Sequence, residues 1–157
     1  MPDFLDAQAM ARKYPDTFFV LSVWQLDAIK RGDYIQVCRH NERFWVLVTR
    51  HDGEFVFGTV ESSLIDKRNA DLPLGAPIEC ELRHVLDACG QREMKLRAKR
   101  WALVKRMREI EEHQNKLSED EPLPEPLAEE FEAARRAVLD LDGAIESLVP
   151  WPTDRLR

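Results

Sequence analysis

The chain has 157 residues, of which 44% are hydrophobic and 33% charged, and its formal net charge is −6. A chain of this size suits one domain with an appendage, and the acidic balance argues against a protein that binds polyanions over its whole surface. Its three cysteines lack the C-x-x-C spacing of a zinc knuckle or a disulfide framework, and no apolar run reaches the roughly 20 residues of a membrane helix. We expect a soluble cytoplasmic protein with free thiols, no metal, no cofactor and no membrane association.

Residues 3–33 combine short helical and extended segments. The apolar spacing in residues 3–14 predicts a helix with Asp3 as its N-cap, since a carboxylate there accepts a hydrogen bond from a free backbone N–H. The run "TFFVL" at residues 17–21 predicts a strand, and Ser22 can cap a second short helix that follows it.

Residues 33–86 are rich in β-branched and aromatic side chains, which favours strands. The Asp52-Gly53 pair between two apolar runs is typical of a type I′ hairpin turn, whose two central residues need positive φ. Because open sheet edges invite aggregation, four or five short strands joined by tight turns favour closure of the sheet. We therefore predict an α+β protein with a small SH3-like β-barrel. Its expected strands lie at residues 33–40, 43–50, 54–60 and 77–85.

Residues 91–149 carry the pattern of a helical hairpin. Apolar residues recur there at spacings of three, four and seven, as in a heptad seam. Pro122, Pro124 and Pro126 exclude one continuous helix, because proline lacks the amide donor that a helix interior needs. The short connector favours two antiparallel helices, closed within one monomer or across a homodimer. The predicted seam consists of Leu96, Leu103, Met107, Ile110, Leu117, Leu127, Phe131, Ala134, Val138, Leu141, Ile145 and Leu148.

The predicted organisation has two parts. Residues 1–90 hold the N-terminal helices and the barrel, and residues 91–157 hold the hairpin and a C-terminal tail. In that tail Trp151 stands between two prolines, and we expect it to pack against protein rather than to face solvent.

Charge is unevenly distributed along the hairpin. Residues 92–108 hold eight basic residues and one acid, a net of +7, whereas residues 109–132 hold ten acids and one lysine, a net of −9. One hypothesis is that the basic segment contacts nucleic-acid phosphates while its tryptophan stacks on a base. The alternative is a solvated helix face that pairs with acids elsewhere in the fold. The residues concerned are Lys95, Arg97, Lys99, Arg100, Trp101, Lys105, Arg106 and Arg108.

Aromatic residues in the β-rich zone suggest a contact surface. Period-two alternation puts Phe44, Val46 and Val48 on one face of their strand and Trp45 on the other. Since both faces are apolar, one covers the core and the other meets a helix, a partner or a ligand. Trp45 then either packs beneath helices of the same chain or anchors a partner groove. The candidate contact residues are Trp24, Tyr34, Glu42, Arg43 and Trp45.

No catalytic constellation stands out. Phosphate-binding, dinucleotide-binding, zinc-protease and nucleophile-elbow motifs are all missing from the sequence. Cys38 with His40, and Cys80 with His84, share strand faces, but a strand interior seldom presents ligands as a tetrahedral cluster. We assign no metal ligand and no catalytic residue, which favours a non-enzyme over an enzyme of unrecognised type.

Four short motifs follow one another in the β-rich zone. They are Gly32-Asp33 before a strand, Glu-Arg-Phe-Trp-Val-x-Val at residues 42–48, Gly-x-Val at residues 58–60, and a last strand from Gly75 to the pair His84-Val85. In this order the chain resembles a family of small bacterial domains of unknown function, over roughly residues 20–86. The resemblance implies a compact β module and no particular activity.

These patterns favour a non-enzymatic protein-binding module, or an accessory or inhibitor protein, with the barrel groove and the hairpin as contact surfaces. Nucleic-acid binding through residues 92–108 is the alternative function, and a protein is the expected partner.

Overall fold

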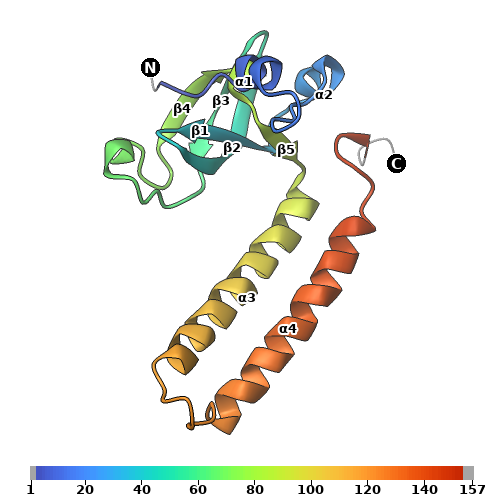
Figure 1. Ribbon diagram of the computed structural model, residues 1–157. Helices are drawn as coiled ribbons and strands as arrows, with labels where there is room; N and C mark the ends of the chain where they lie inside the picture. The colour runs from blue at the N-terminus through green and yellow to red at the C-terminus, as the bar shows by residue number, and fades with distance from the viewer. Residues whose placement is uncertain (1–2, 154–157) are drawn as a thin grey trace. The chain divides into compact units, whose positions relative to one another are not determined.

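The computed structural model describes residues 3–153, which fold into two compact units (Figure 1). The sheet unit comprises the residues up to Gln91 together with Pro150–Thr153, and the hairpin unit comprises Arg92–Val149. The predicted division after residue 90 is close to the first of these boundaries. The tail from Pro150 onward, however, belongs to the sheet unit and not to the hairpin.

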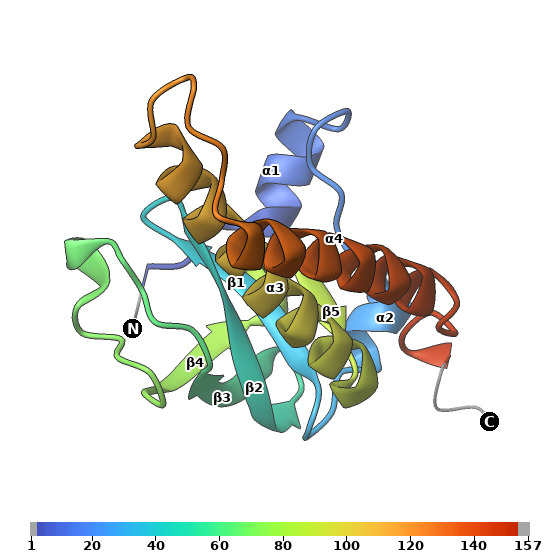
Figure 2. The same cartoon turned by 90° about the horizontal axis from the view of Figure 1, so that it is seen from below.

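A five-stranded antiparallel sheet forms the sheet unit, in the order β4-β3-β2-β1-β5, and the α+β class is confirmed (Figure 2). Burial alternates along β2, where Phe44, Val46 and Val48 are buried and the residues between them are not, as the period of two in a strand requires. The strands are β1 (Tyr34–Arg39), β2 (Glu42–Asp52), β3 (Phe55–Val60), β4 (Pro77–Glu81) and β5 (Asp87–Cys89).

The sheet is open, so the expected closure into an SH3-like barrel is not confirmed. Strands β4 and β5 are its two edges, and no ladder joins them in the described part of the chain. A short 3-10 helix, η2 (Leu82–His84), leads the chain from one edge to the other. The Leu82 amide donates to the Glu54 carbonyl at 2.9 Å, and the Leu86 amide donates to the Gln36 carbonyl at 2.8 Å. These bonds tie both ends of the crossing to the sheet.

The predicted fourth strand, residues 77–85, is therefore two elements. Strand pairing with β3 ends at Glu81, and the chain then turns through η2 before β5 begins at Asp87. Because β5 is only three residues long, its pattern is too short to be distinguished from a loop by composition.

Two tight turns set the register of the central strands. The turn between β1 and β2 is type I′, since His40 and Asn41 have φ values of 51° and 62°. In the turn between β2 and β3, the central residues are Gly53 and Glu54, and only Gly53 has a positive φ, of 58°. The hairpin predicted at Asp52-Gly53 is thus confirmed, whereas its predicted turn type is wrong. A positive φ at the first central residue alone is typical of type II′.

The core of the sheet unit is built from one face of the sheet. Buried side chains from all five strands form one hydrophobic cluster, which Phe4 from the N-terminal segment and Trp151 from the tail complete. Each fully buried Val, Leu or Phe side chain contributes roughly 1.5 to 3 kcal/mol through the apolar surface it removes from water. The expectation that Trp151 packs against protein is confirmed.

Two short helices precede the sheet, and the N-cap of the first is Asp6 rather than Asp3. The Asp6 carboxylate accepts a hydrogen bond from the Ala9 amide at 2.8 Å. The helix begins later than predicted because the Leu5 amide donates to the Cys38 carbonyl at 2.8 Å, which holds the preceding residues extended. The helices are α1 (Ala7–Lys13) and α2 (Val23–Asp27).

The segment Thr17–Leu21 between these helices belongs to no strand, so the strand predicted there is wrong; Thr17 lies in a turn and residues 18–21 have no regular secondary structure. Its composition favours extended backbone. Its side chains rather than its backbone meet the sheet unit, because Phe18 and Val20 pack against a small cluster that contains Cys38 and Leu86.

The hairpin unit holds two long helices, α3 (Gln91–Asn115, all but its first residue) and α4 (Glu125–Glu146), which run side by side (Figure 1). At 1.5 Å per residue, α3 is about 38 Å long. Ion pairs join Arg100 to Asp142 and Arg106 to Glu130, so later residues of α3 meet earlier residues of α4. The helices are therefore antiparallel, and here they pair within one chain.

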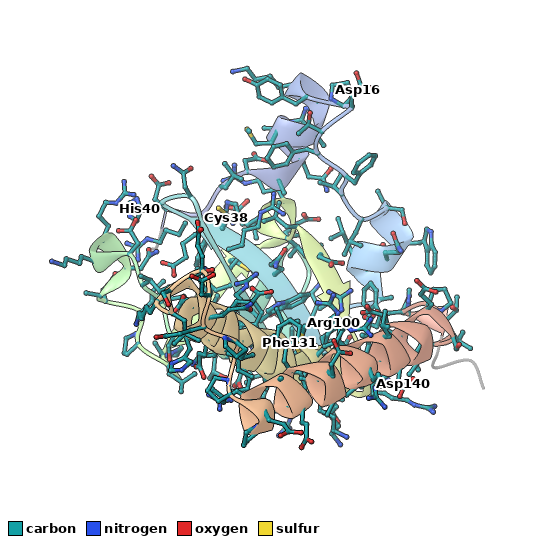
Figure 3. All side chains as sticks on the ribbon, turned by 60° about the horizontal axis from the view of Figure 1, so that its bottom comes forward. Asp16, Cys38, His40, Arg100, Phe131 and Asp140 are labelled. Carbon is teal, nitrogen blue, oxygen red and sulfur yellow. The ribbon has the colours of Figure 1, made fainter. Side chains whose placement is uncertain are left out.

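The predicted heptad seam lies between these two helices. Ile110, Ala134 and Val138 are buried, and every other predicted seam residue is at least half-buried. Figure 3 shows the position of Phe131 on α4 and of Arg100 on α3. Among residues 3–153, no helix is long and apolar enough to cross a membrane.

Candidate functional site

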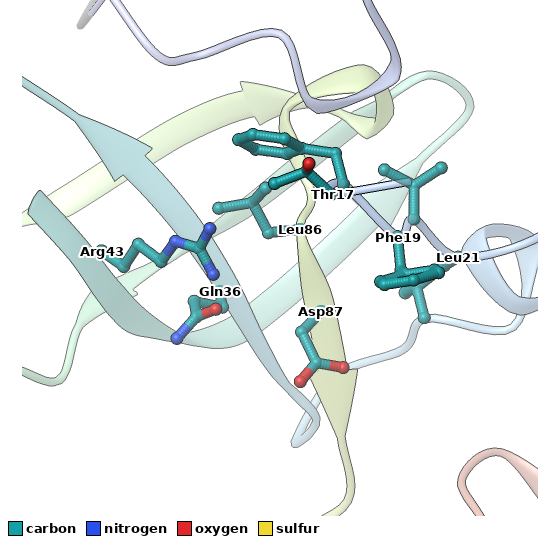
Figure 4. A pocket seen from close by; sticks show the side chains of 9 residues that line it. Thr17, Phe19, Leu21, Gln36, Arg43, Leu86 and Asp87 are labelled. Atoms are coloured by element: carbon teal, nitrogen blue, oxygen red, sulfur yellow. The ribbon is translucent and has the colours of Figure 1, made fainter. Parts of the chain in front are cut away.

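A pocket of about 360 Å³ lies between the segment Thr17–Leu21 and the sheet. The segment Thr17–Leu21 forms one wall, and Gln36, Arg43, Leu86 and Asp87 form the other (Figure 4). The lining combines five apolar side chains with four polar ones and contains no histidine or cysteine.

Two of the polar side chains stand on neighbouring strands. In the register of the two strands, Gln36 of β1 lies opposite Trp45 of β2. Arg43 precedes Trp45 by two residues, so Gln36 and Arg43 are diagonal neighbours on the outer face of the sheet. Figure 4 shows them at the same end of the pocket. Neither side chain has a hydrogen bond or an ion pair within residues 3–153, and the Arg43 guanidinium lies 5.9 Å from the ring centre of Phe18. Both groups are therefore able to bond to a ligand.

Exposed apolar side chains gather in the stretch that borders the pocket. Phe19 is 80% exposed, Val23 is 76% exposed, and Trp24 is 57% exposed. Three large apolar side chains on so short a stretch are more than the scattered exposure that any surface shows, and such groups mark contact sites. We call Phe19, Val23 and Trp24 the N-terminal apolar patch. It contains one of the predicted contact residues, Trp24.

Trp45 and Tyr34, two further predicted contact residues, are both half-buried on the outer face of the sheet. The Trp45 amide donates to the Ser62 hydroxyl oxygen at 3.2 Å. Burial raises the pKa of Tyr34, and Glu61 and Cys89 act in the same direction. The phenol of Tyr34 therefore stays neutral at physiological pH.

Glu42, also a predicted contact residue, has a structural role. Its carboxylate accepts hydrogen bonds from the Ile65 amide at 2.7 Å, from the Asp66 amide at 3.0 Å and from Asn69 Nδ2 at 3.0 Å. The bond from the Ile65 amide is the largest of the effects that lower the pKa of Glu42. The charged carboxylate thus anchors the long loop after β3, in which Lys67–Asn69 form the 3-10 helix η1.

The structure divides the predicted nucleic-acid-binding residues into two sets. Three arginines are paired with acids of the hairpin unit, one of them within α3 itself. The other four basic side chains, Lys95, Lys99, Lys105 and Arg108, have no ion pair within residues 3–153. The paired arginines are Arg97 with Glu93 at 3.4 Å, Arg100 with Asp142 at 2.5 Å, and Arg106 with Glu130 at 2.6 Å.

Trp101 is the exposed aromatic ring of this helix. It is 60% exposed, and the Arg108 guanidinium lies 5.8 Å from its ring centre. Lys105 follows Trp101 by one helical turn and thus stands on the same side of α3. An aromatic ring with two cations beside it is the arrangement that stacks on single-stranded nucleic acid.

The thiols and the ring of His84 are buried in the sheet unit. All three cysteines are buried; burial raises the pKa of Cys80 to about 12 and also raises the pKa of Cys38, so both stay protonated. Cys38 lies on β1, and His40 lies in the turn that follows (Figure 3). The ring of His84 is buried, and its Nδ1 accepts a hydrogen bond from the Glu81 amide at 3.0 Å. Within the part of the chain that the structure describes, no group of three or more His, Cys, Asp and Glu side chains is placed to hold a metal ion.

In comparisons with known proteins, no family model matches the chain, and no match was found among curated proteins or among solved structures. The resemblance to small bacterial β domains therefore rests on the sequence motifs alone.

The sequence predicted Arg43 as a contact residue but did not predict the pocket that it lines. The pocket joins the segment Thr17–Leu21 to Leu86 and Asp87, which are far away in the chain, and their proximity depends on the pairing of β5 with β1. The available signal was the period of two along β1 and β2, which puts Gln36 and Arg43 on the outer face. Without the register, that signal does not show that the two side chains are neighbours.

Proposed function

We propose that the chain is a non-enzymatic protein-binding module, and that the pocket and the N-terminal apolar patch form its contact surface. The observation that carries this proposal is the position of the unpaired Arg43 in a pocket bordered by exposed apolar side chains. Arginine and aromatic residues supply most of the binding energy in protein interfaces, especially beside a pocket that a partner side chain can fill. An enzyme is less well supported, because the pocket lining offers no histidine or cysteine and contains a single carboxylate.

We also propose that the sheet unit is a half-open SH3-like barrel. In support, β5 returns to pair beside β1, and η2 carries the chain across the gap between the two edges. The buried free thiols support a reducing location such as the cytoplasm.

The proposed surface can be tested with a phage-displayed library of random dodecapeptides panned on the full chain. We expect selected peptides to bind in solution, as measured by fluorescence anisotropy. Phe19→Ala and Trp24→Ala should each weaken that binding by about tenfold, since each removes an aromatic contact.

Ile65→Ala is the matched control, because Ile65 is 91% exposed but lies outside the pocket and the patch. It should leave the affinity unchanged. Two outcomes would argue against the proposed function: a panning that yields no binding peptide, or selected peptides that bind both alanine variants as tightly as the natural chain.

Nucleic-acid binding by α3 is a second candidate function, favoured by the exposed ring of Trp101 with Arg108 beside it. A fluorescein-labelled oligothymidylate is a suitable probe. Its affinity should fall with salt at a log–log slope of about −0.7 per phosphate contacted. Trp101→Ala should weaken binding by roughly 1 to 3 kcal/mol, the usual contribution of one stacked base.

Trp24→Ala is the control for the oligonucleotide, since it removes an exposed tryptophan from the sheet unit and not from α3. Anisotropy that does not change with the oligonucleotide at low salt would exclude this second function.

A further inference from the structure

We infer that the ligand of the pocket is an extended acidic segment of a partner protein, which adds as a strand beside Phe19–Leu21 and places an Asp or Glu side chain on Arg43. This inference rests on the proposed protein-binding function and specifies its recognition mode. Three features of the sheet unit support it: free backbone groups, a pocket with both apolar and polar lining residues, and a cation without an ion pair.

The free backbone groups belong to Phe19–Leu21. Hydrogen bonding along the chain stops at the Phe18 amide, which donates to the Tyr14 carbonyl at 2.9 Å, and resumes at the Ser22 amide, which donates to Gln25 Oε1 at 2.9 Å. Between them, none of the three residues has a hydrogen bond to another described residue. Their N–H and C=O groups are therefore available, as on the free edge of a sheet.

The composition of this segment separates it from an ordinary surface loop. Loops are rich in Gly, Pro, Asn, Asp and Ser, whereas residues 17–21 read Thr-Phe-Phe-Val-Leu, which favours strands. Phe19 is exposed, whereas Phe18, Val20 and Leu21 are half-buried, so the segment turns most of its apolar side chains toward the sheet unit. The segment thus has the composition of a strand but no neighbouring strand. An added peptide strand would supply that neighbour through main-chain hydrogen bonds.

The pocket provides the side-chain contact for such a strand. Successive side chains of a strand point to opposite sides, so every second residue of an added peptide can enter the pocket. Phe18, Leu21 and Leu86 offer apolar contacts in it, and its volume of about 360 Å³ accommodates an aliphatic side chain. We expect Val, Ile or Leu at that position of the peptide.

The positive charge of Arg43 favours a peptide with a negatively charged side chain. The Arg43 guanidinium has no ion pair in the described part of the chain, and its planar fork can bind a carboxylate through two parallel hydrogen bonds. The Gln36 amide beside it can donate a further bond. Asp87 lines the pocket too, and its carboxylate accepts from the Ala88 amide at 2.8 Å. Because like charges repel, the acidic residue of the peptide belongs at the Arg43 end.

The peptides selected on the full chain test this recognition mode. They should share an Asp or Glu at a fixed distance from an aliphatic residue. Arg43→Gln should weaken their binding by about tenfold or more, whereas Arg43→Lys, which keeps the charge, should retain part of the affinity. In NMR spectra of the full chain, the amides of Phe19–Leu21 should exchange with solvent more slowly when the peptide is bound.

Arg50→Gln is the matched control, because Arg50 also stands exposed on β2, where it pairs with Asp52 outside the pocket. It should leave the affinity unchanged. Peptides that bind Arg43→Gln as tightly as the natural chain, or that leave the exchange of Phe19–Leu21 unaltered, would overturn the inference while the protein-binding function stands. Affinity that depends on a free peptide C-terminus, and not on internal acids, would overturn the assignment of an acidic side chain. If no peptide is selected, the proposed function fails and the inference fails with it.

Discussion

The side chain of His84 is held neutral by its surroundings. Its ring is buried beside Phe4, with 5.8 Å between the ring centres, and its Nδ1 must be unprotonated to accept the hydrogen bond from the Glu81 amide. Burial lowers the pKa of His84 below its ordinary value, and the charge of Arg83 acts in the same direction. Glu81 and Asp6 oppose this shift but do not cancel it.

We expect acidification from about pH 7.5 to about pH 5.5 to lower the free energy of unfolding of the sheet unit, because the unfolded histidine titrates near pH 6.5 while the folded one resists protonation. The unfolded state then binds more protons, so the stability present above the unfolded pKa is lost as the pH falls. Urea unfolding followed by tryptophan fluorescence at both pH values measures the effect.

His84→Asn provides the comparison, since its side-chain oxygen can accept the same hydrogen bond and does not titrate. The stability of this variant should depend less on pH over the same interval. An equal pH dependence in both proteins would mean that other groups cause it.

At the scale of elements, Gly58 allows β2 and β3 to pack closely. A Cβ atom at this position would lie 2.4 Å from the Leu47 carbonyl oxygen and 2.6 Å from Val46 Cγ1. Gly58 pairs with Val48, where the register between the strands shifts before Arg50. A shift of this kind bends and twists a strand, which brings the neighbouring backbone close.

Gly58→Ala should therefore destabilise the sheet unit by about 2 to 3 kcal/mol, because backbone atoms must move to admit the methyl group. Gly143→Ala is the opposite case: nothing lies within 4 Å of a Cβ at this position of α4, and the change should stabilise the helix by roughly 0.5 to 1 kcal/mol. Urea unfolding of both variants measures the two changes. A fully stable Gly58→Ala protein would contradict the observed packing.

The elements that could be predicted from the sequence are those with a local signal. The alternation of Phe44, Val46 and Val48 and the heptad seam of the hairpin depend only on neighbours in the chain, and both predictions agree with the structure. Residues 17–21 have the composition of a strand, but a strand also needs a partner, and pairing is not local. The break of the predicted strand over residues 77–85 has the same cause, because η2 forms where the chain leaves β3.

The candidate site was less predictable than the fold. Arg43 was selected for its place beside Trp45, but the pocket that it lines is formed with the distant segment Thr17–Leu21. Glu42 was selected for the same reason, and its carboxylate is instead used by the loop after β3. Both outcomes depend on contacts between distant parts of the chain, which spacing along a strand does not contain.

At the scale of the whole molecule, the sheet unit is made from two separate parts of the chain. Trp151 follows the hairpin unit in sequence and yet belongs to the same hydrophobic cluster as Phe4 and the five strands. The large indole side chain of Trp151 is only 8% exposed. The tail is therefore part of the core and not an accessory to the hairpin.

We expect Trp151→Ala to lower the free energy of unfolding by about 3 to 5 kcal/mol, the usual cost of removing a buried aromatic side chain. Trp24→Ala should change it by no more than about 0.5 kcal/mol, because Trp24 is mostly exposed. Circular dichroism during thermal unfolding, with both variants at the same concentration, compares them. Equal melting temperatures for the two would show that the tail does not stabilise the sheet unit.

The place of Trp151 in the core also bears on how the protein is made. Domains usually fold as they leave the ribosome, beginning with the part that emerges first. Here all five strands emerge early, while the indole that fills their interior is translated only after both long helices. A nascent chain halted within α4 therefore carries strands around a vacant site, and chaperones that bind exposed apolar surface should hold it until translation passes Trp151.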